Sequence, residues 1–493
     1  MRGLVAAAML VALALVLSAP AASGGACTSS RFAPQPSPAM ANTTWPTEHA
    51  DGWRTHAVAA GLPSDVGQMK LHTRVATLPP VPVWGYVGRG DDLYVLGGSP
   101  YLLDMFTALI LGAPRSSVPL LIERSKRYAE TLTPYVARID ARSMRAKTLP
   151  LTGGTTANYT GGLLVHANGF LYAVVRSTVY KIDPATLGVV ASAPLPPAPE
   201  ASGQPNQQTA YNGIQASANG DLILKGWAST GGGNLPPGIL LRVDPGDLSI
   251  KVQLVTTDVA APRMALATVN GQEELYFPDQ TQSVRWLLDP AAFALDTSWS
   301  QNYLAQGSTE ASSDVFMGNG VVFASNTNPT ATTPMQVFSQ GATPGSPLLS
   351  TRAFSSNSAQ WNFFMMAGDP YKSGIAVVND ELSGHVAGFR VCSGGEGVRK
   401  LWENSAIRTS AGMAIDYRGG QLYADDRRCT RTKCRLYLDV LSLRTGRRIA
   451  SVRVKGDKPS IGQIFVGRNA VYYVATNTHD AHGYVTRVTA SRR

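Results

Sequence analysis

Short apolar segments recur along most of this chain, and each leads through a turn containing Gly or Asn into a second apolar segment. Clear copies occupy residues 91–94, 168–172, 219–222 and 419–423. Gly and Asn accept the positive φ that tight hairpin turns require, so each copy predicts two antiparallel strands. The pattern as a whole predicts an all-β fold made of small antiparallel sheets.

The spacing of these turns indicates how the sheets are arranged. After a long first gap, the residues that open the second segments lie 51, 53, 46, 54, 47 and 49 residues apart. This is the period of β-propeller blades. We therefore predict a single β-propeller over residues 71–493 with eight blades, or seven if the divergent unit around Val321 or Ile375 is not a separate blade. The positions counted are Leu93, Leu171, Leu222, Leu275, Val321, Ile375, Leu422 and Val471.

A second repeated feature is an Asp turn, usually Asp-Pro, that follows the third strand of a blade. It occurs at residues 182–187, 243–248 and 288–293, with a degenerate copy at 139–144. Asp can accept hydrogen bonds from the backbone that follows it, and Pro presets φ for a turn. Together the two repeats resemble those of quinoprotein-like and YVTN-type bacterial β-propellers, over roughly residues 70 to 491. The resemblance implies the fold and carries no function with it.

Two further segments complete the predicted ring. The last repeat ends without a fourth strand, and residues 71–78 have the pattern of that strand, so the N-terminal part of the ring is predicted to close it. The gap between Leu93 and Leu171 predicts an insertion at residues 100–134, which has the pattern of two short helices.

The N-terminal residues are those of an exported bacterial protein. Residues 1–26 have the pattern of a signal peptide, because the apolar run at 4–17 is too short to span a bilayer. The residues around Cys27 are similar to the lipobox of bacterial lipoproteins, except that Gly24 stands where Leu is usual. Lipidation of Cys27 and ordinary cleavage are both open. Residues 27–70 are rich in Pro, Ser and Thr and are predicted to be a leader or tether that includes His49 and His56. The expected location is periplasmic, extracellular or lipid-anchored.

Cysteines and charge refine this picture. Cys429 and Cys434 bracket a short loop and are predicted to form a disulfide, as an oxidising compartment allows. Cys392 would then be a buried free thiol if Cys27 carries lipid. The formal net charge is +10, and a basic cluster surrounds the predicted disulfide, where it could hold a polyanion or a membrane surface. Nucleic acid is excluded as a partner because no aromatic residues are interleaved. The cluster is Arg427, Arg428, Arg431, Lys433, Arg435, Arg444, Arg447 and Arg448.

No familiar catalytic motif is present. The chain has no Gly-x-Ser-x-Gly, Walker or His-Glu-x-x-His motif. It also lacks the vicinal Cys pair and the Trp repeats of a quinoprotein dehydrogenase. The sequence therefore leaves open whether this protein is an enzyme.

Propellers bind ligands over the central channel with polar residues at the starts of the inner strands. The residues at these places are Tyr159, Asn212, Arg263, Asp314, Asn362 and Ser410. Asn212, Asp314 and Asn362 are similar to the ligand set of the SMP-30/gluconolactonase family, and such a set would suit a hard cation such as calcium. Arg263 would instead favour a carboxylate or another anion.

Three functions are compatible with these residues. The first is an exported binding or interaction propeller that takes a small anionic ligand or a protein partner at the channel face. The alternatives are a metal-dependent hydrolase or lactonase of the SMP-30 type and a degenerate quinoprotein-like oxidoreductase.

Overall fold

The fold was analysed in a computed structural model. Residues described are 37–98, 120, 131–152, 161–198, 208–229, 238–256, 263–278, 282–299, 301–302, 316–318, 321–324, 335–339, 349–351, 353–354, 364–380, 384–392, 397–409, 412–430, 434–457, 464–476 and 482–492.

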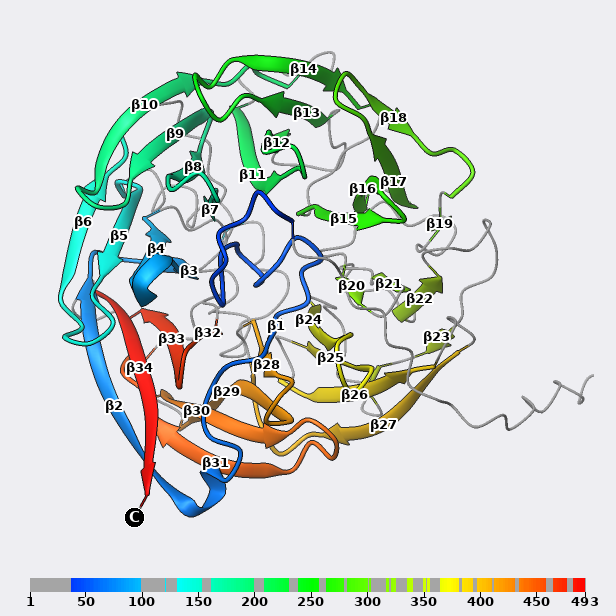
Figure 1. Ribbon diagram of the computed structural model, residues 1–493. Coiled ribbons are helices and arrows are strands. Elements are labelled where there is room, and N and C mark those ends of the chain that lie inside the picture. Colours follow the sequence, from blue (N-terminus) through cyan, green and yellow to red (C-terminus); the bar gives the residue numbers. More distant parts are fainter. Residues whose placement is uncertain are drawn as a thin grey trace, which may run out of the picture.

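Within these residues the strands form eight sheets arranged around a centre (Figure 1), and all strand pairs are antiparallel except β1 (Ala57–Val58) with β28 (Ala414–Asp416). The chain is a single all-β propeller, as predicted. The first sheet along the ring consists of β3 (Pro82–Val87), β4 (Leu93–Gly97), β5 (Tyr135–Ile139) and β6 (Ala146–Pro150), and the second of β7 (Gly162–Val165), β8 (Leu171–Val175), β9 (Thr178–Asp183) and β10 (Gly188–Pro194). The third consists of β11 (Gln208–Ala216), β12 (Leu222–Ser229), β13 (Gly238–Val243) and β14 (Ile250–Val255). The fourth consists of β15 (Ala265–Val269), β16 (Gln272–Pro278), β17 (Gln282–Leu288) and β18 (Phe293–Leu295), with β19 (Gln301–Asn302) beside β17.

The other four sheets continue around the ring in sequence order. The fifth sheet consists of β20 (Phe316–Gly318), β21 (Val321–Ala324), β22 (Met335–Ser339) and β23 (Leu349–Thr351), and the sixth of β24 (Phe364–Asp369), β25 (Ile375–Asp380), β26 (Val386–Val391) and β27 (Val398–Asn404). The seventh consists of β28 (Ala414–Asp416), β29 (Gln421–Cys429), β30 (Cys434–Ser442) and β31 (Arg448–Arg453), extended by β1 (Ala57–Val58). The eighth consists of β32 (Ile464–Gly467), β33 (Ala470–Thr476), β34 (Gly483–Arg492) and β2 (Met69–Leu78). Two 3₁₀ turns, η1 (Val66–Gln68) and η2 (Arg89–Asp91), precede β2 and β4.

The last of these sheets joins the two ends of the described chain. β2 pairs antiparallel with β34 over its whole length, from Met69 opposite Arg492 to Leu78 opposite Gly483. The N-terminal strand is therefore the outermost strand of the sheet that holds the C-terminal strands, and Figure 1 shows the two side by side at the rim.

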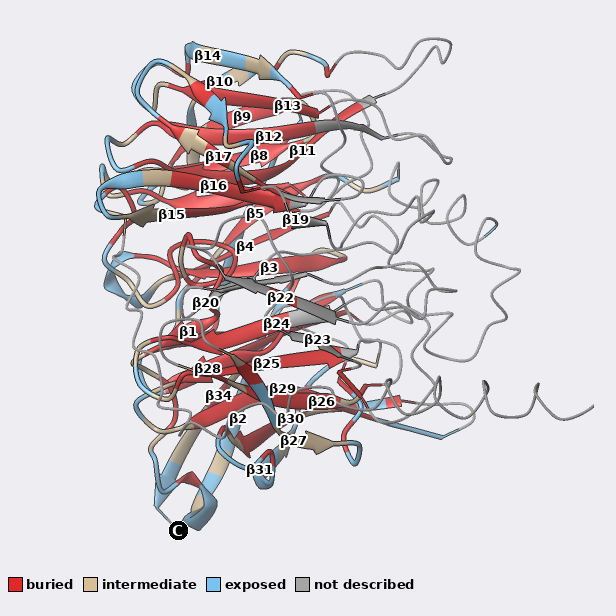
Figure 2. Cartoon of the chain, turned by 90° about the vertical axis from the view of Figure 1, so that its right-hand side faces the viewer, coloured by how far each residue is buried: buried red, intermediate tan, exposed pale blue. Residues whose placement is uncertain are grey.

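The Asp turns have the local structure that their sequence predicts. Asp183 Oδ1 accepts a hydrogen bond from Ala185 N at 2.8 Å, and Asp289 Oδ1 accepts one from Ala291 N at 2.7 Å. In two of the turns, Leu187 and Leu248 have positive φ values of 54° and 66°. A leucine rarely adopts this conformation, but both side chains are buried between sheets, which offsets the strain. Figure 2 shows that burial runs along the strands.

The centre of the ring is occupied by the chain itself. Residues Ser37–Leu62, here called the central segment, cross the middle of Figure 1. The innermost strands present unpaired backbone N–H groups to the axis, and carbonyls of the central segment accept hydrogen bonds from them. These bonds, each 2.8 Å long, run from Val87 N to Trp45 O, Val165 N to Pro46 O, Leu266 N to Gly52 O, Gly368 N to Thr55 O and Ile415 N to His56 O.

The prediction of a leader or tether over residues 27–70 is therefore wrong from residue 37 onward. Trp45, Thr47 and Thr55 are fully buried, and a tether would leave such residues in solvent. The central segment pairs with edges that lie far apart in the sequence, so no local periodicity marks it. Residues 1–36, including the predicted signal peptide, lie outside the described residues.

Almost all of the predicted helical insertion at residues 100–134 lies outside the described residues. Only Leu120 and residues 131–134 of this segment are described. The described residues contain no element of α-helix. Among them, no helix has the length and apolar character needed to cross a membrane.

Candidate functional site

A cluster of ionisable side chains lies buried at the ring centre. Arg263 Nη1 donates to the Glu48 carboxylate, and Glu48 Oε1 lies 2.9 Å from His49 Nε2. Arg54 Nη2 donates to His49 Nε2 at 2.6 Å, and the two imidazoles of His49 and His56 contact each other. Four of these five residues belong to the central segment, and Arg263 precedes β15. The cluster therefore attaches the central segment to the ring through side chains as well as backbone.

Burial governs the protonation of this cluster. Burial raises the pKa of Glu48, and the neighbouring Arg263 and Arg54 charges act against that shift. Burial and the same two arginines hold the pKa of His49 well below its usual value. Burial also holds the pKa of His56 well below its usual value, together with His49. Both imidazoles are therefore neutral at neutral pH.

Two of the six predicted channel residues are described, and they lie together. Arg263 Nη1 donates to the Asn212 backbone carbonyl at 2.8 Å, and the Arg263 guanidinium stacks 4.5 Å from the Trp84 ring centroid. Arg263 does bind a carboxylate, but that carboxylate is Glu48 of the same chain. Tyr159, Asp314, Asn362 and Ser410 lie outside the described residues.

The surroundings of Asn212 do not suit a cation. Its Oδ1 accepts a hydrogen bond from Lys225 Nζ at 2.9 Å, and both side chains are fully buried. An ammonium at this distance would repel a metal ion from the only oxygen that the side chain offers. Within the described residues there is also no group of three or more His, Cys, Asp and Glu placed to hold a metal.

A large cavity opens on one side of the central segment, and we call it the basin. Its volume is about 920 Å³, within the range of small-molecule sites. The central segment forms its floor, and residues of six sheets form its wall, mostly at the turns that follow the inner strands. Wall residues include Arg89, Ala216, Thr268, Tyr371, Tyr417 and Arg468. The propeller fold brings the turns of these six sheets together around one cavity.

One side of the basin combines a carboxylate with aromatic rings. Asp51 Oδ1 accepts a hydrogen bond from Thr55 N at 3.0 Å, and Asp51 Oδ2 accepts from Thr55 Oγ1 and, at 3.2 Å, from Tyr371 OH. The Tyr371 and Tyr417 rings lie 4.8 Å apart between centroids. Trp53 also lines the basin, but it packs with Ala265, Tyr276 and Trp299 in another cluster. We call Asp51, Tyr371 and Tyr417 the acidic aromatic corner.

Asp51 carries its charge without a cationic neighbour. Among the described residues, none of the Lys, Arg or His side chains pairs with it, and its stabilising hydrogen bonds come from Thr55, Tyr371 and the backbone of Trp53. Burial raises the pKa of Asp51 to about 6. The carboxylate is therefore poised between its protonated and ionised forms under mild conditions.

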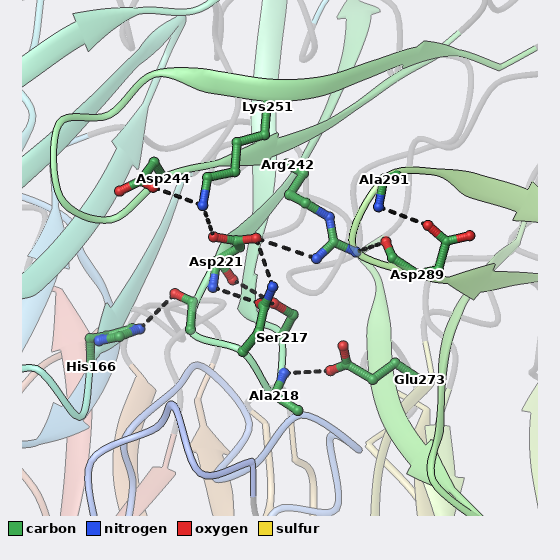
Figure 3. Close-up of polar contacts among 12 residues, drawn as sticks. His166, Ser217, Ala218, Asp221, Arg242, Asp244, Lys251, Glu273, Asp289 and Ala291 are labelled. Carbon is green, nitrogen blue, oxygen red and sulfur yellow. Dashed lines mark hydrogen bonds and ion pairs between the residues drawn. The ribbon is translucent and has the colours of Figure 1, made fainter.

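Another polar network joins neighbouring sheets and does not form a site. Figure 3 shows Asp221 with two cations, Arg242 at 3.4 Å and Lys251 at 2.6 Å. Arg242 also donates to the next sheet, and equivalent cations in the two preceding sheets do the same. Each lies two residues before the Asp of its own turn and donates to the following turn: Arg138 to Pro184 O and Ala185 O, Lys181 to Gly246 O, and Arg242 to Asp289 O. These contacts hold the ring together.

Three of the eight residues in the basic cluster near Cys429 have contacts within the fold. Arg427 is buried, and Arg428 pairs with Asp426 at 2.8 Å. Arg448 pairs with Asp439 at 2.5 Å and with Asp426 at 3.1 Å. Binding of a polyanion or a membrane surface by this cluster stays a prediction. Arg431 and Lys433 lie outside the described residues.

The predicted disulfide between Cys429 and Cys434 is present, with a sequence separation of 5 residues. Cys392 is also disulfide-bonded, so its interpretation as a free thiol is wrong. The proposed lipid site, Cys27, lies outside the described residues.

No protein-family model matches this chain, and neither does any curated protein. The solved structures that share its fold include two quinohemoprotein alcohol dehydrogenases. The quinohemoprotein alcohol dehydrogenase ADHIIG of Pseudomonas putida HK5 has a TM-score of 0.57 at 10% identity, covering 92% of this chain and 81% of that one. The quinohemoprotein alcohol dehydrogenase of Comamonas testosteroni has a TM-score of 0.58 at 11% identity, covering 91% and 81%.

The similarity to these two structures shows a β-propeller fold and, at 10% and 11% identity, no activity. The resemblance to quinoprotein-like propellers, inferred from the blade repeats, is confirmed at the level of the fold. Similarity to the SMP-30/gluconolactonase family is not shown.

Sequence reasoning missed every residue of the central cluster except Arg263. The available signal was composition, because Trp45, Glu48, Trp53 and Arg54 stand close together in a stretch otherwise rich in Pro, Ser and Thr. Disordered segments contain few aromatic residues, so the two Trp residues were the signal for a packed segment.

Proposed function

We propose that this protein is an exported binding propeller that holds a small ligand in the basin. The observation that carries the proposal is the cavity of about 920 Å³ that the central segment floors and six sheets surround. We further propose that each of the eight sheets is one blade and that β2 closes the ring. A closed ring gives the basin a rigid wall, which reduces the conformational entropy that the protein loses when a ligand binds.

Ligand binding in the basin differs from the predicted binding in the central channel, because the central segment occupies that channel. Buried side chains fill the axis, and Arg263, the predicted anion contact, is already paired with Glu48. A ligand would therefore contact the outer surface of the central segment. The residues available to it there are polar and aromatic, including Asp51, Arg89 and Tyr417.

The test is to fill the basin and measure what the protein retains. Asn42 is exposed and lines the basin, so Asn42→Trp should obstruct it without disturbing the core. Thr148→Trp is the matched control, since Thr148 is exposed on the outermost strand β6. Both variants and the wild type would be purified from the exported fraction and analysed by native mass spectrometry.

We expect a small molecule bound to the wild type and to Thr148→Trp, and its loss from Asn42→Trp. Retention of the same molecule by all three proteins would contradict the proposal. So would the absence of any bound molecule, combined with no binding in a screen of metabolites against the wild type.

A further inference from the structure

We propose that the acidic aromatic corner binds an organic cation, such as a protonated amine or a quaternary ammonium group. This inference rests on the proposed function, because it names the ligand class of the same basin. Its basis is the carboxylate of Asp51, which lines a cavity beside aromatic rings and has no cationic partner among the described residues.

The first step concerns the carboxylate. A partly buried carboxylate is stabilised by a paired cation or else becomes protonated. Three hydrogen bonds from Thr55 and Tyr371 favour the ionised form of Asp51, but they bring no positive charge. A positive charge that pairs with Asp51 would therefore have to come from a ligand in the basin.

The second step concerns the rings. Aromatic faces attract cations through their quadrupole, and the attraction grows where water is excluded. The Tyr371 and Tyr417 rings lie at an interplanar angle of 30°, and both residues line the basin. A carboxylate beside two rings thus favours a large, weakly hydrated cation over a metal ion, which would require more oxygen ligands.

The third step concerns the other charges nearby. Asp369 and Asp416 also lie close enough to raise the pKa of Tyr417, after the larger effect of burial. Two cations are also near, since the Arg418 charge lowers the pKa of Tyr417 and Lys372 Nζ donates to the Arg418 carbonyl at 3.0 Å. Three carboxylates, those of Asp51, Asp369 and Asp416, act on Tyr417 against the single guanidinium of Arg418. Arg468 and Arg89 line the basin on the sheets that follow Tyr417 around the ring, and they make a cation less favourable there.

The experiment compares two ligands of the same shape. Choline carries a trimethylammonium group, and 3,3-dimethylbutan-1-ol is its neutral isostere. Binding of each to the wild type would be measured by calorimetry at pH 7.5, with Asp51→Asn as the test variant. Asp91→Asn is the charge-matched control, because Asp91 also lines the basin, on its far side, and its φ of 65° is one that Asn tolerates.

We expect choline to bind about tenfold more tightly than the isostere, Asp51→Asn to remove that preference, and Asp91→Asn to retain it. Equal binding of both ligands, abolished by Asn42→Trp, would overturn the inference and leave the proposed function standing. Absence of choline binding to the wild type would overturn the inference as well, while the ligand-retention test still decides the proposed function.

A second measurement covers the case in which Asp51→Asn does not fold. In the wild type, the preference for choline should fall as the pH is lowered through about 6, because Asp51 gains a proton there. Binding of the neutral isostere should change little. A preference for choline that is constant from pH 7.5 to 5 would contradict the role given to Asp51.

Discussion

The guanidinium of Arg263 forms a buried ion pair with the carboxylate of Glu48, which precedes it by 215 residues. The pair links the central segment to the inner edge of the ring. Removing one partner of such a pair leaves an uncompensated buried charge, and this typically costs about 3–5 kcal/mol. We predict that Arg263→Met lowers the free energy of unfolding by that amount, as measured by urea denaturation.

The matched control removes both charges. Glu48→Gln combined with Arg263→Met removes both charges of this pair, so the double variant should be more stable than Arg263→Met alone. A loss below about 1 kcal/mol in the single variant would show that Glu48 is protonated or solvated, in conflict with an ion pair to Arg263.

Asp51 should make stability depend on pH in an unusual direction. Its pKa is raised from 3.8 to about 6 on folding, so the folded state binds this proton more tightly than the unfolded state. The resulting stabilisation is complete below pH 3.8 and is lost as the pH rises through 6. The loss amounts to up to about 3 kcal/mol. Unfolding curves at several pH values should show this contribution in the difference between wild type and Asp51→Asn. A difference that does not change over this range would contradict it.

His49 and His56 should act in the opposite direction. Both have a folded-state pKa well below 6.5, so acid favours the unfolded state, in which they take up protons. Stability is therefore lost as the pH falls below 6.5. His56→Gln should reduce this acid sensitivity, whereas His72→Gln, at an exposed position, should preserve it. Equal slopes in the two variants, measured by acid titration of unfolding, would refute the prediction.

Equivalent contacts between sheets should differ in strength according to burial. Arg242 is buried with Asp221, whereas Lys181 donates to Gly246 O at the surface. We predict that Arg242→Met costs about 2–4 kcal/mol and Lys181→Met less than about 1 kcal/mol. Thermal and urea unfolding of the two variants checks the ranking. Similar losses in both would mean that position in the ring matters more than desolvation.

The parts of the fold that follow from local sequence were predictable. Each hairpin and each Asp turn is specified within a few residues, as the Asp183 and Asp289 hydrogen bonds show. The Cys429–Cys434 bridge was equally local. Pairing of residues 71–78 with the last strand is distant in sequence, yet the missing fourth strand pointed to it, and β2 lies beside β34.

The candidate site could not be predicted in the same way. The partners of His56 are the Met413 carbonyl and the Ile415 amide, more than 350 positions away, and nothing in the sequence near His56 specifies them. The basin depends on this placement, because Asp51 reaches its wall only when the central segment crosses the ring. Arg263 was identified from its place before an inner strand, but its partner required the fold.

The position of the central segment can be tested directly by hydrogen exchange. Residues 45–57 lie inside the ring, and most of them are buried, so exchange of their backbone amides should require global unfolding. We predict that peptides covering these residues exchange as slowly as the inner strands and far more slowly than the exposed turn at residues 89–91. Exchange of residues 45–57 at the rate of that turn would contradict a ring filled by its own N-terminal segment.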